Sequence, residues 1–181
     1  MGSGKDTFYK ILKNECDIGI KRLAFGDNVK RAAYAIFGGD RNKYFGTQEE
    51  KNEELPFWKS ELGEAYSTYR KIAQTFGTEI CRHNIHHDIW VLSLESKIKE
   101  LLSAGKHVAV TDVRFDNEAQ MIQSYGGLVI EMINTNNTYV GDEHASEAGV
   151  SPELIDMQIV ASSLNELSSS VRTFVNEHFC N

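Results

Sequence analysis

The sequence has few cysteines, no long apolar run and no surplus of positive charge. Its three cysteines, Cys16, Cys81 and Cys180, are odd in number and widely spaced, which argues against a disulfide framework and for a reducing compartment. No run approaches the roughly 20 apolar residues of a membrane span, and no basic-then-apolar leader opens the chain. We therefore expect a protein that is not exported and acts in the cytoplasm. A formal net charge of −7 disfavours binding to nucleic acid polymers but leaves small anionic ligands open.

The chain also lacks the first half of the motif with which it opens. It begins Met-Gly-Ser-Gly-Lys-Asp-Thr, and Gly-x-Gly-Lys followed by a hydroxyl residue is the second half of the phosphate-binding loop G-x-x-x-x-G-K-[ST]. A complete loop would have a further glycine two residues before Met1, and an apolar strand ahead of it. We expect Met1 to be an internal methionine of a longer sequence. The alternative is the remnant of a flexible Gly/Ser tag.

This glycine turn predicts a site for the phosphates of ATP. Glycines let backbone N–H groups turn toward phosphate oxygens, and the amino end of the following helix adds partial positive charge. The candidate ATP-phosphate-binding residues are Gly2, Ser3, Gly4, Lys5, Asp6 and Thr7. Lys5 is expected to reach the outer phosphates. Thr7, or Asp6 in the place where Ser or Thr usually follows the lysine, is expected to approach Mg²⁺.

Short apolar strands alternate with longer helices along the chain, which indicates an α/β fold with a parallel sheet covered on both faces. Strands are expected at residues 21–25, 107–113, 128–133 and 157–161. Helices are expected at residues 7–14, 27–37, 68–81 (interrupted at Gly77-Thr78), 88–104 and 163–178, with a further helix capped by Asp116 or Asn117 and a surface loop at 40–56. We expect a single domain over residues 1–181, with ligand at the carboxyl ends of the strands.

The expected strand at 107–113 ends in Asp112, and Arg114 follows two residues later. Phosphate-loop enzymes place at such a strand end the carboxylate that holds Mg²⁺, directly or through water. Arg114 would emerge on the same side, where its guanidinium can fork onto a phosphate. The alternative is an aspartate that caps the next helix beside a solvated arginine.

A third set of candidates lies in the expected helix at 68–81. Arg70 and Gln74 are one helical turn apart and so share a face. An arginine and an amide on one face suit a nucleoside monophosphate, because one binds phosphate and the other a base edge. Arg82 lies just beyond them. The alternative is an ordinary amphipathic helix with a charged outer face.

Together these motifs resemble the bacteriophage-type deoxynucleoside monophosphate kinases, which are phosphate-loop enzymes distantly similar to animal phosphomevalonate kinase. The likeness covers nearly the whole chain in matching order. It rests on residues 2–7, the series Arg70, Gln74, Gly77-Thr78, Arg82 and Trp90, then Asp112-Val113-Arg114 with Glu118, and finally Asp142-x-His144-x-Ser146-Glu147. Asp inserted between Lys and Thr, as in Lys5-Asp6-Thr7, is itself a habit of that group.

The resemblance implies a three-layer P-loop NTPase-like fold, with its first strand absent here and a lid-like segment at about 134–149. It implies transfer of the γ-phosphoryl group of ATP to a (deoxy)nucleoside 5′-monophosphate with Mg²⁺. The implied catalytic residues are Lys5, Arg114 and Asp112; the Mg²⁺ residues are Thr7 and Asp112; the acceptor-binding residues are Arg70, Gln74, Arg82 and Arg114. The implied partners are small nucleotides, not a nucleic acid polymer or a membrane, in the host cytoplasm if the gene is a phage gene. A homodimer is left open.

The chain departs from the family pattern at the lid. No Lys or Arg occurs between Arg114 and Arg172, although the family's lid contributes a basic residue to the transferring phosphoryl group. His144 is the candidate cation there, and it is at most partly charged near neutral pH. Ser162-Ser163 stands where members of this family have an Asn-containing turn after the last strand. Two alternatives therefore stay open, a nucleotide-binding remnant without catalysis and a kinase of another small phosphate-bearing acceptor.

Overall fold

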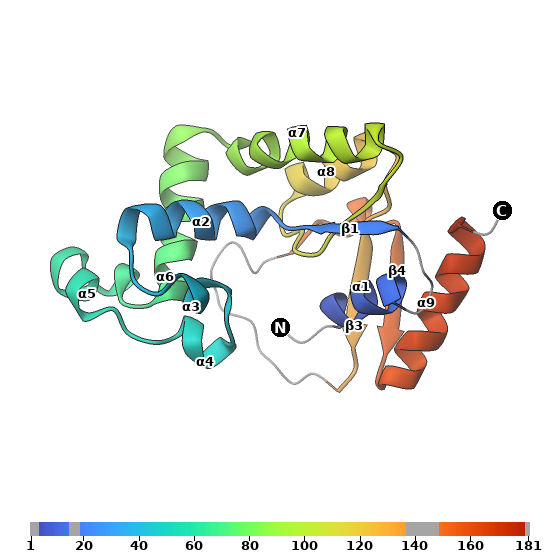
Figure 1. The fold of residues 1–181 in the computed structure, drawn as a ribbon, viewed down its shortest axis with the longest axis horizontal. Coiled ribbons are helices and arrows are strands. Elements are labelled where there is room, and N and C mark those ends of the chain that lie inside the picture. The colour runs from blue at the N-terminus through green and yellow to red at the C-terminus, as the bar shows by residue number, and fades with distance from the viewer. Residues whose placement is uncertain (1–3, 15–18, 137–148, 180–181) are drawn as a thin grey trace. The chain divides into compact units, whose positions relative to one another are not determined.

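The computed structural model describes residues 4–14, 19–136 and 149–179, and the chain divides into two compact units (Figure 1). Unit 1 comprises Met1–Leu23 and Lys97–Asn181, and unit 2 comprises Ala24–Ser96. The α/β class with parallel strands is confirmed. The single domain stays a prediction. In the described ranges, no helix is both long and apolar enough to cross a membrane.

Unit 1 contains two pairs of parallel strands. β1 (Ile20–Leu23) pairs with β2 (His107–Val110), and β3 (Ile130–Asn134) pairs with β4 (Met157–Ala161). Among the described residues the strands form two separate two-stranded sheets, β1-β2 and β3-β4. The helical elements of unit 1 are α1 (Lys5–Asn14), the second half of α7 (Ile89–Ser103), α8 (Asp116–Ser124), the 3₁₀ turn η4 (Pro152–Leu154) and α9 (Leu164–Phe179).

The core of unit 1 forms where α1 and α9 pack together. The apolar face predicted for the first helix is buried, and the ring of Phe8 lies 5.6 Å from that of Phe174 on α9. The predicted cap of the last helix is also confirmed, since the Glu166 N–H donates to the Ser163 hydroxyl over 3.2 Å. This packing fixes the position of α1, whose amino end carries the glycine turn.

Unit 2 is helical. Its elements are α2 (Phe25–Phe37), α3 (Arg41–Phe45), α4 (Gln48–Lys51), α5 (Pro56–Leu62), η1 (Glu64–Tyr66), α6 (Tyr69–Gln74), the π-helix η2 (Thr75–Ile85) and the first half of α7. Aromatic side chains fill much of its interior. Phe37 is the centre of this cluster, with the rings of Trp58, Tyr66 and Phe76 at 5.1, 5.7 and 6.0 Å.

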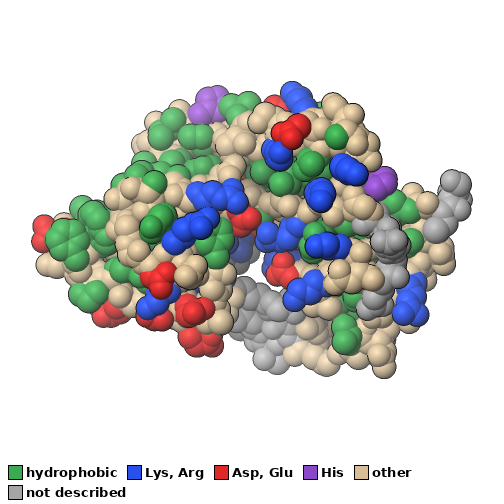
Figure 2. All heavy atoms as spheres, in the orientation of Figure 1, with side chains coloured by type: hydrophobic (Ala, Val, Ile, Leu, Met, Phe, Trp, Pro, Cys, Tyr) green, Lys and Arg blue, Asp and Glu red, His purple; other side chains and the backbone are tan. Residues whose placement is uncertain are grey.

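The surface loop predicted at residues 40–56 is wrong in part, because α3 and α4 lie within it. Side-chain caps start both helices: Asp40 accepts from the Asn42 N–H over 2.9 Å, and Thr47 accepts from the Glu50 N–H over 3.2 Å. Tyr44 anchors the segment in the interior. The polar surface predicted for it is confirmed, and Figure 2 shows acidic side chains gathered over α3 and α4.

The helix interruption predicted at Gly77-Thr78 is also wrong. The helical path continues from α6 through η2, and it widens instead of breaking. A Cβ on Gly77 would stand 2.8 Å from Val29 Cγ1, so the glycine lets η2 pack closely on α2. The Gly77 carbonyl accepts a 2.8 Å hydrogen bond from the Trp90 indole. Tertiary contacts therefore override the helix-breaking tendency of glycine.

A first prediction concerns the turn after α8. The Gly127 N–H donates to the Ile122 carbonyl, and a Cβ on Gly127 would stand 2.7 Å from Ile122 Cγ2 and 3.0 Å from that carbonyl oxygen. Because the turn cannot move away from its own hydrogen bond, we expect Gly127→Ala to lower the free energy of unfolding by about 1–3 kcal/mol in urea titrations. Gly19→Ala is the control, since nothing lies within 4 Å of its Cβ position. Equal stability of the two variants would contradict this packing.

Candidate phosphate-binding site

The amino end of α1 has the geometry of an anion-binding turn. Gly4 adopts a φ of 97°, a conformation that favours glycine, and its carbonyl accepts the first helical hydrogen bond from the Phe8 N–H over 2.8 Å. The N–H groups of the first turn have no partner within the helix, so they carry partial positive charge toward any ligand there. The helix starts at Lys5, two residues before the predicted start. Gly2 and Ser3 lie outside the described residues.

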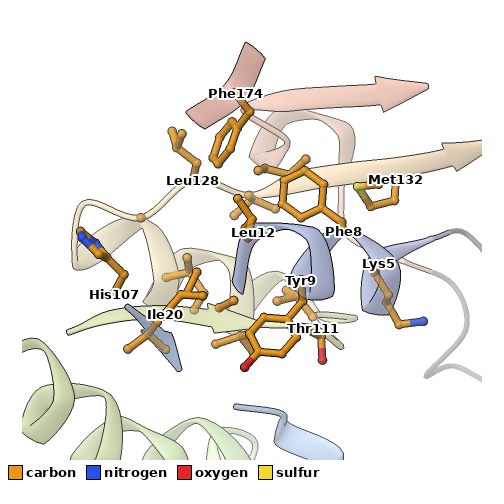
Figure 3. Close-up of a pocket in the computed structure, with 18 of the residues that line it drawn as sticks. Lys5, Phe8, Tyr9, Leu12, Ile20, His107, Thr111, Leu128, Met132 and Phe174 are labelled. Atoms are coloured by element: carbon orange, nitrogen blue, oxygen red, sulfur yellow. The ribbon is translucent and has the colours of Figure 1, made fainter. Parts of the chain in front are cut away.

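The three side chains after Gly4 have different surroundings. Lys5 lines a pocket of about 790 Å³ and lies at one end of it (Figure 3). Asp6 carries its carboxylate 3.8 Å from the guanidinium of Arg22 on β1, in an exposed ion pair. Thr7 is half-buried. Among the described residues Lys5 forms no ion pair, so its ammonium remains available for an anion.

Two residues that follow β2, Thr111 and Val113, line the same pocket. Thr111 is 9% exposed, and its hydroxyl has no hydrogen-bond partner among the described residues. A buried polar group without a partner costs about 1–3 kcal/mol and needs an explanation. Sequence reasoning missed this residue, because the only signal was its place directly before Asp112.

The strand predicted at 107–113 is too long, because β2 ends at Val110. The Thr111 N–H still donates to the Leu23 carbonyl over 3.2 Å, and the chain then turns. The Glu118 carboxylate holds this turn, accepting from the N–H of Arg114 over 2.9 Å and of Phe115 over 3.3 Å. At 3% exposure this carboxylate is buried. Glu118 therefore positions the segment that carries Asp112 and Arg114, both of them half-buried.

Three of the four predicted acceptor-binding residues, Arg70, Gln74 and Arg82, lie in unit 2, whereas Arg114 lies in unit 1. Arg70 on α6 donates from Nε to Asn52 Oδ1 over 2.8 Å and also donates to the side-chain oxygen of Gln48. Gln74 is the last residue of the same helix and is half-buried. Arg82 in η2 is 3% exposed and donates to the His87 carbonyl over 3.2 Å. Their role toward a nucleotide stays a prediction. Most of the lid-like segment at about 134–149, including His144, lies outside the described residues.

Comparison with known proteins assigns the chain to a family. The sequence profile of the deoxynucleotide monophosphate kinases matches residues 29–171. The chain belongs to the deoxynucleotide monophosphate kinase family. The resemblance noted in the sequence is thereby confirmed, and membership indicates an enzyme that transfers phosphoryl groups to nucleotides. The profile match begins after the glycine turn, so it does not include Lys5.

Two viral relatives carry names of the same family. A protein of Acanthamoeba polyphaga mimivirus, assigned by name to the deoxynucleotide monophosphate kinases, is 30% identical over 155 residues, which is 81% of this chain and 76% of that protein. The deoxynucleoside-5′-monophosphate kinase of Escherichia phage T5 is 28% identical over 113 residues. That alignment covers 58% of this chain and 44% of the phage protein, so the chain aligns with less than half of the T5 enzyme.

In this member of the family, α8 is tied to Ser151, directly before η4. Asp116 Oδ1 accepts from the Ser151 N–H over 2.8 Å, and Oδ2 accepts from the Ser151 hydroxyl over 2.7 Å. Both hydrogen bonds favour the carboxylate, so they hold the pKa of Asp116 below its usual value near 3.8. The contribution of a carboxylate with a depressed pKa is present above that value and is lost as the pH falls through the folded-state pKa.

We expect Asp116→Asn to lower the melting temperature more at pH 7 than at pH 3. At pH 7 the variant loses the charge that strengthens both hydrogen bonds, whereas at pH 3, below the usual pKa near 3.8, the unfolded wild-type chain takes up a proton and part of the contribution of this charge to stability is already lost. Melting curves of both proteins between pH 3 and pH 7 measure the difference. A deficit that stays constant across this range would show that the charge of Asp116 contributes nothing to the tether.

Proposed function

We propose that the protein transfers the γ-phosphoryl group of ATP to a (deoxy)nucleoside 5′-monophosphate with the help of Mg²⁺. The observation that carries this proposal is the pocket in unit 1, which both Lys5 and the buried Thr111 line and whose Thr111 hydroxyl has no partner among the described residues. Family membership supports the nucleotide kinase function. Phosphoryl transfer needs alignment and positive charge more than covalent chemistry from the protein, and a helix start with a lysine supplies both.

Unit 1 is assigned the phosphate donor. The backbone of residues 2–7 and the Lys5 ammonium would hold the β- and γ-phosphates of ATP. Arg114, on the turn held by Glu118, would neutralise negative charge on the phosphoryl group in transfer. The Thr111 hydroxyl, buried at this edge with no partner among the described residues, would donate to a phosphate oxygen or to an ordered water.

The Mg²⁺ ion fits the side chains at this edge of unit 1. A hard divalent cation prefers carboxylate and hydroxyl oxygens, and the buried Thr111 hydroxyl has no hydrogen-bond partner among the described residues. Thr7 and Asp112 would hold the ion, directly or through water. Asp6 is the less suitable candidate, because its carboxylate is paired with Arg22. The ion would supply charge neutralisation at the phosphate oxygens.

Unit 2 is assigned the nucleoside monophosphate. Arg70 and Arg82 would bind its phosphate, and Gln74 would donate to its base or ribose. The amide side chains of Asn52 and Gln48 accept hydrogen bonds from the Arg70 guanidinium. Arg82 is nearly inaccessible in this structure, so its assignment requires that the ligand replace the present contact with His87.

The wider proposal is a P-loop kinase of three layers over residues 1–181, lacking the first strand of its sheet and closed by the lid-like segment at about 134–149. It would act on free nucleotides in the cytoplasm, without a nucleic acid polymer. A direct test mixes the chain with ATP, Mg²⁺ and each nucleoside monophosphate and measures ADP. Stabilisation by a monophosphate without ADP would favour a binding protein without catalysis, and turnover of a non-nucleotide acceptor would favour another substrate class.

We expect Lys5→Ala to lower kcat/KM for ADP formation by at least about a hundredfold, because an electrostatic contact to the transferring group is lost. Lys10→Ala is the matched control, since Lys10 is an exposed lysine on the same helix and should retain wild-type turnover. A coupled ADP assay measures both variants. Wild-type-like turnover of Lys5→Ala would refute the assigned role.

The acceptor site is tested separately. Arg70→Ala should raise the KM for the nucleoside monophosphate by about tenfold or more, as expected for the loss of a charge-assisted contact, and leave the KM for ATP unchanged. Lys71→Ala is the control, because Lys71 is the next residue of α6 and pairs with Glu64. Steady-state kinetics with each substrate varied in turn separate the two constants. Equal effects on both KM values would speak against an acceptor contact.

A further inference from the structure

The sequence places little positive charge in the segment that follows the end of β2. No Lys or Arg occurs between Arg114 and Arg172, so the lid-like segment at about 134–149 carries neither. Phosphoryl transfer depends mainly on alignment and on positive charge around the phosphate oxygens. Unit 1 contains a further cation beside the glycine turn, Arg22 on β1, to which no role has been given above.

The alternation of side chains along β1 directs Arg22 toward α1. Ile20 is buried in the core cluster to which α1 and α9 contribute. Because side chains two residues apart in a strand share a face, Arg22 lies on the face of Ile20, and Lys21 lies on the opposite face. Two residues of a strand span about 7 Å. Arg22 is therefore displaced from the core toward the carboxyl end of β1, where it meets the first turn of α1.

The contact between Arg22 and this turn is an ion pair with Asp6. Arg22 Nε lies 3.8 Å from Asp6 Oδ1, and Asp6 directly follows Lys5. The side chain of Asp6 is 61% exposed and that of Arg22 is 36% exposed. An ion pair between exposed side chains at this distance contributes little to stability. It nevertheless keeps the guanidinium beside the turn, where a phosphate group could take the place of the carboxylate.

The register of the sheet brings Arg22 to the same end of the strands as Thr111. Arg22 pairs with Ala109 on β2, and the Thr111 N–H donates to the Leu23 carbonyl over 3.2 Å. Thr111 lines the pocket together with Lys5, and its buried hydroxyl has no hydrogen-bond partner among the described residues. A guanidinium, an ammonium and a hydroxyl thus come from β1, α1 and the end of β2 to one end of this sheet.

We propose that Arg22 is a phosphate-binding residue, whose guanidinium binds an outer phosphate of a nucleoside triphosphate together with Lys5 and supplies positive charge that the lid-like segment lacks. Phosphate oxygens would replace the Asp6 carboxylate, because a guanidinium can form two parallel charge-assisted hydrogen bonds with them. The inference rests on the phosphate-donor role proposed for residues 2–7. It adds a residue that lies outside the phosphate-loop motif and before residue 29, where the family profile begins.

Two variants at neighbouring positions test the proposal. Arg22→Gln removes the charge and keeps much of the side chain, and Lys21→Gln removes the same charge from the opposite face of β1, where Lys21 is exposed. Calorimetric titration with Mg²⁺ present gives the Kd of a non-hydrolysable ATP analogue and of ADP for each protein. Arg22→Gln should weaken binding of the analogue by about tenfold or more, because a charge-assisted contact is lost. Binding of ADP, which lacks the outermost phosphate, should weaken by less than about threefold, and Lys21→Gln should leave both constants within about twofold of wild type.

A purely structural role of the ion pair predicts a different pattern. Its loss would lower the melting temperature and would weaken binding of the analogue and of ADP alike. This result, or equal affinities of Arg22→Gln and Lys21→Gln for the analogue, would overturn the proposal. Arg22→Lys restores the charge without the planar fork, so it should bind the analogue more tightly than Arg22→Gln. Failure of this rescue would also contradict a charge contact.

An assay of ADP formation on the same proteins separates this inference from the proposed function. If the wild-type chain forms ADP from ATP and a monophosphate while Arg22→Gln binds the analogue as tightly as Lys21→Gln, the kinase function stands and the role of Arg22 is refuted. If the loss of affinity is confined to Arg22→Gln and the analogue in a chain that forms no ADP, the phosphate contact stands and catalysis is refuted. A wild-type chain that binds neither nucleotide would overturn both.

Discussion

Unit 1 depends on one requirement, that both edges of an interior strand find hydrogen-bond partners. In the described residues β2 and β3 each pair along one edge only, and the pocket lies between the other two edges. Residues of the helices α1, α7, α8 and α9 also line this pocket. Lys5 at the start of α1 and Thr111 directly after β2 both line this pocket.

Several groups that can bind a phosphate lie around this pocket. A helix start, the Lys5 ammonium and the Thr111 hydroxyl all lie beside one pocket, and the buried Glu118 carboxylate fixes the turn that carries Asp112 and Arg114. Carboxyl ends of parallel strands are the usual place for a ligand in α/β proteins, because helix starts converge there. Family membership and local geometry therefore support the same chemistry by separate routes.

Much of this fold could be predicted from the sequence, because periodic apolar residues determine element type. The strand predicted at 157–161 is β4 with the same bounds, and the Ser163–Glu166 cap is present. The predictions that were wrong concern positions where contacts between residues distant in sequence determine the local structure. Gly77 does not end its helix, because it packs against Val29 and accepts from Trp90. No local sequence pattern shows that the Thr111 hydroxyl lacks a partner among the described residues or that Glu118 is buried. The sequence could therefore identify Asp112 and Arg114 as candidates, but not the residues that surround them.

The most direct test of the central claim is a titration of the isotopically labelled 181-residue chain with Mg²⁺ and a non-hydrolysable ATP analogue, followed by amide NMR. We expect the amides of Gly4 to Thr7 and those of Thr111 to Arg114 to shift together and to saturate at the same ligand concentration, because both segments would contact one bound phosphate group. Shifts confined to one of the two segments, or saturation at different concentrations, would contradict a shared phosphate site.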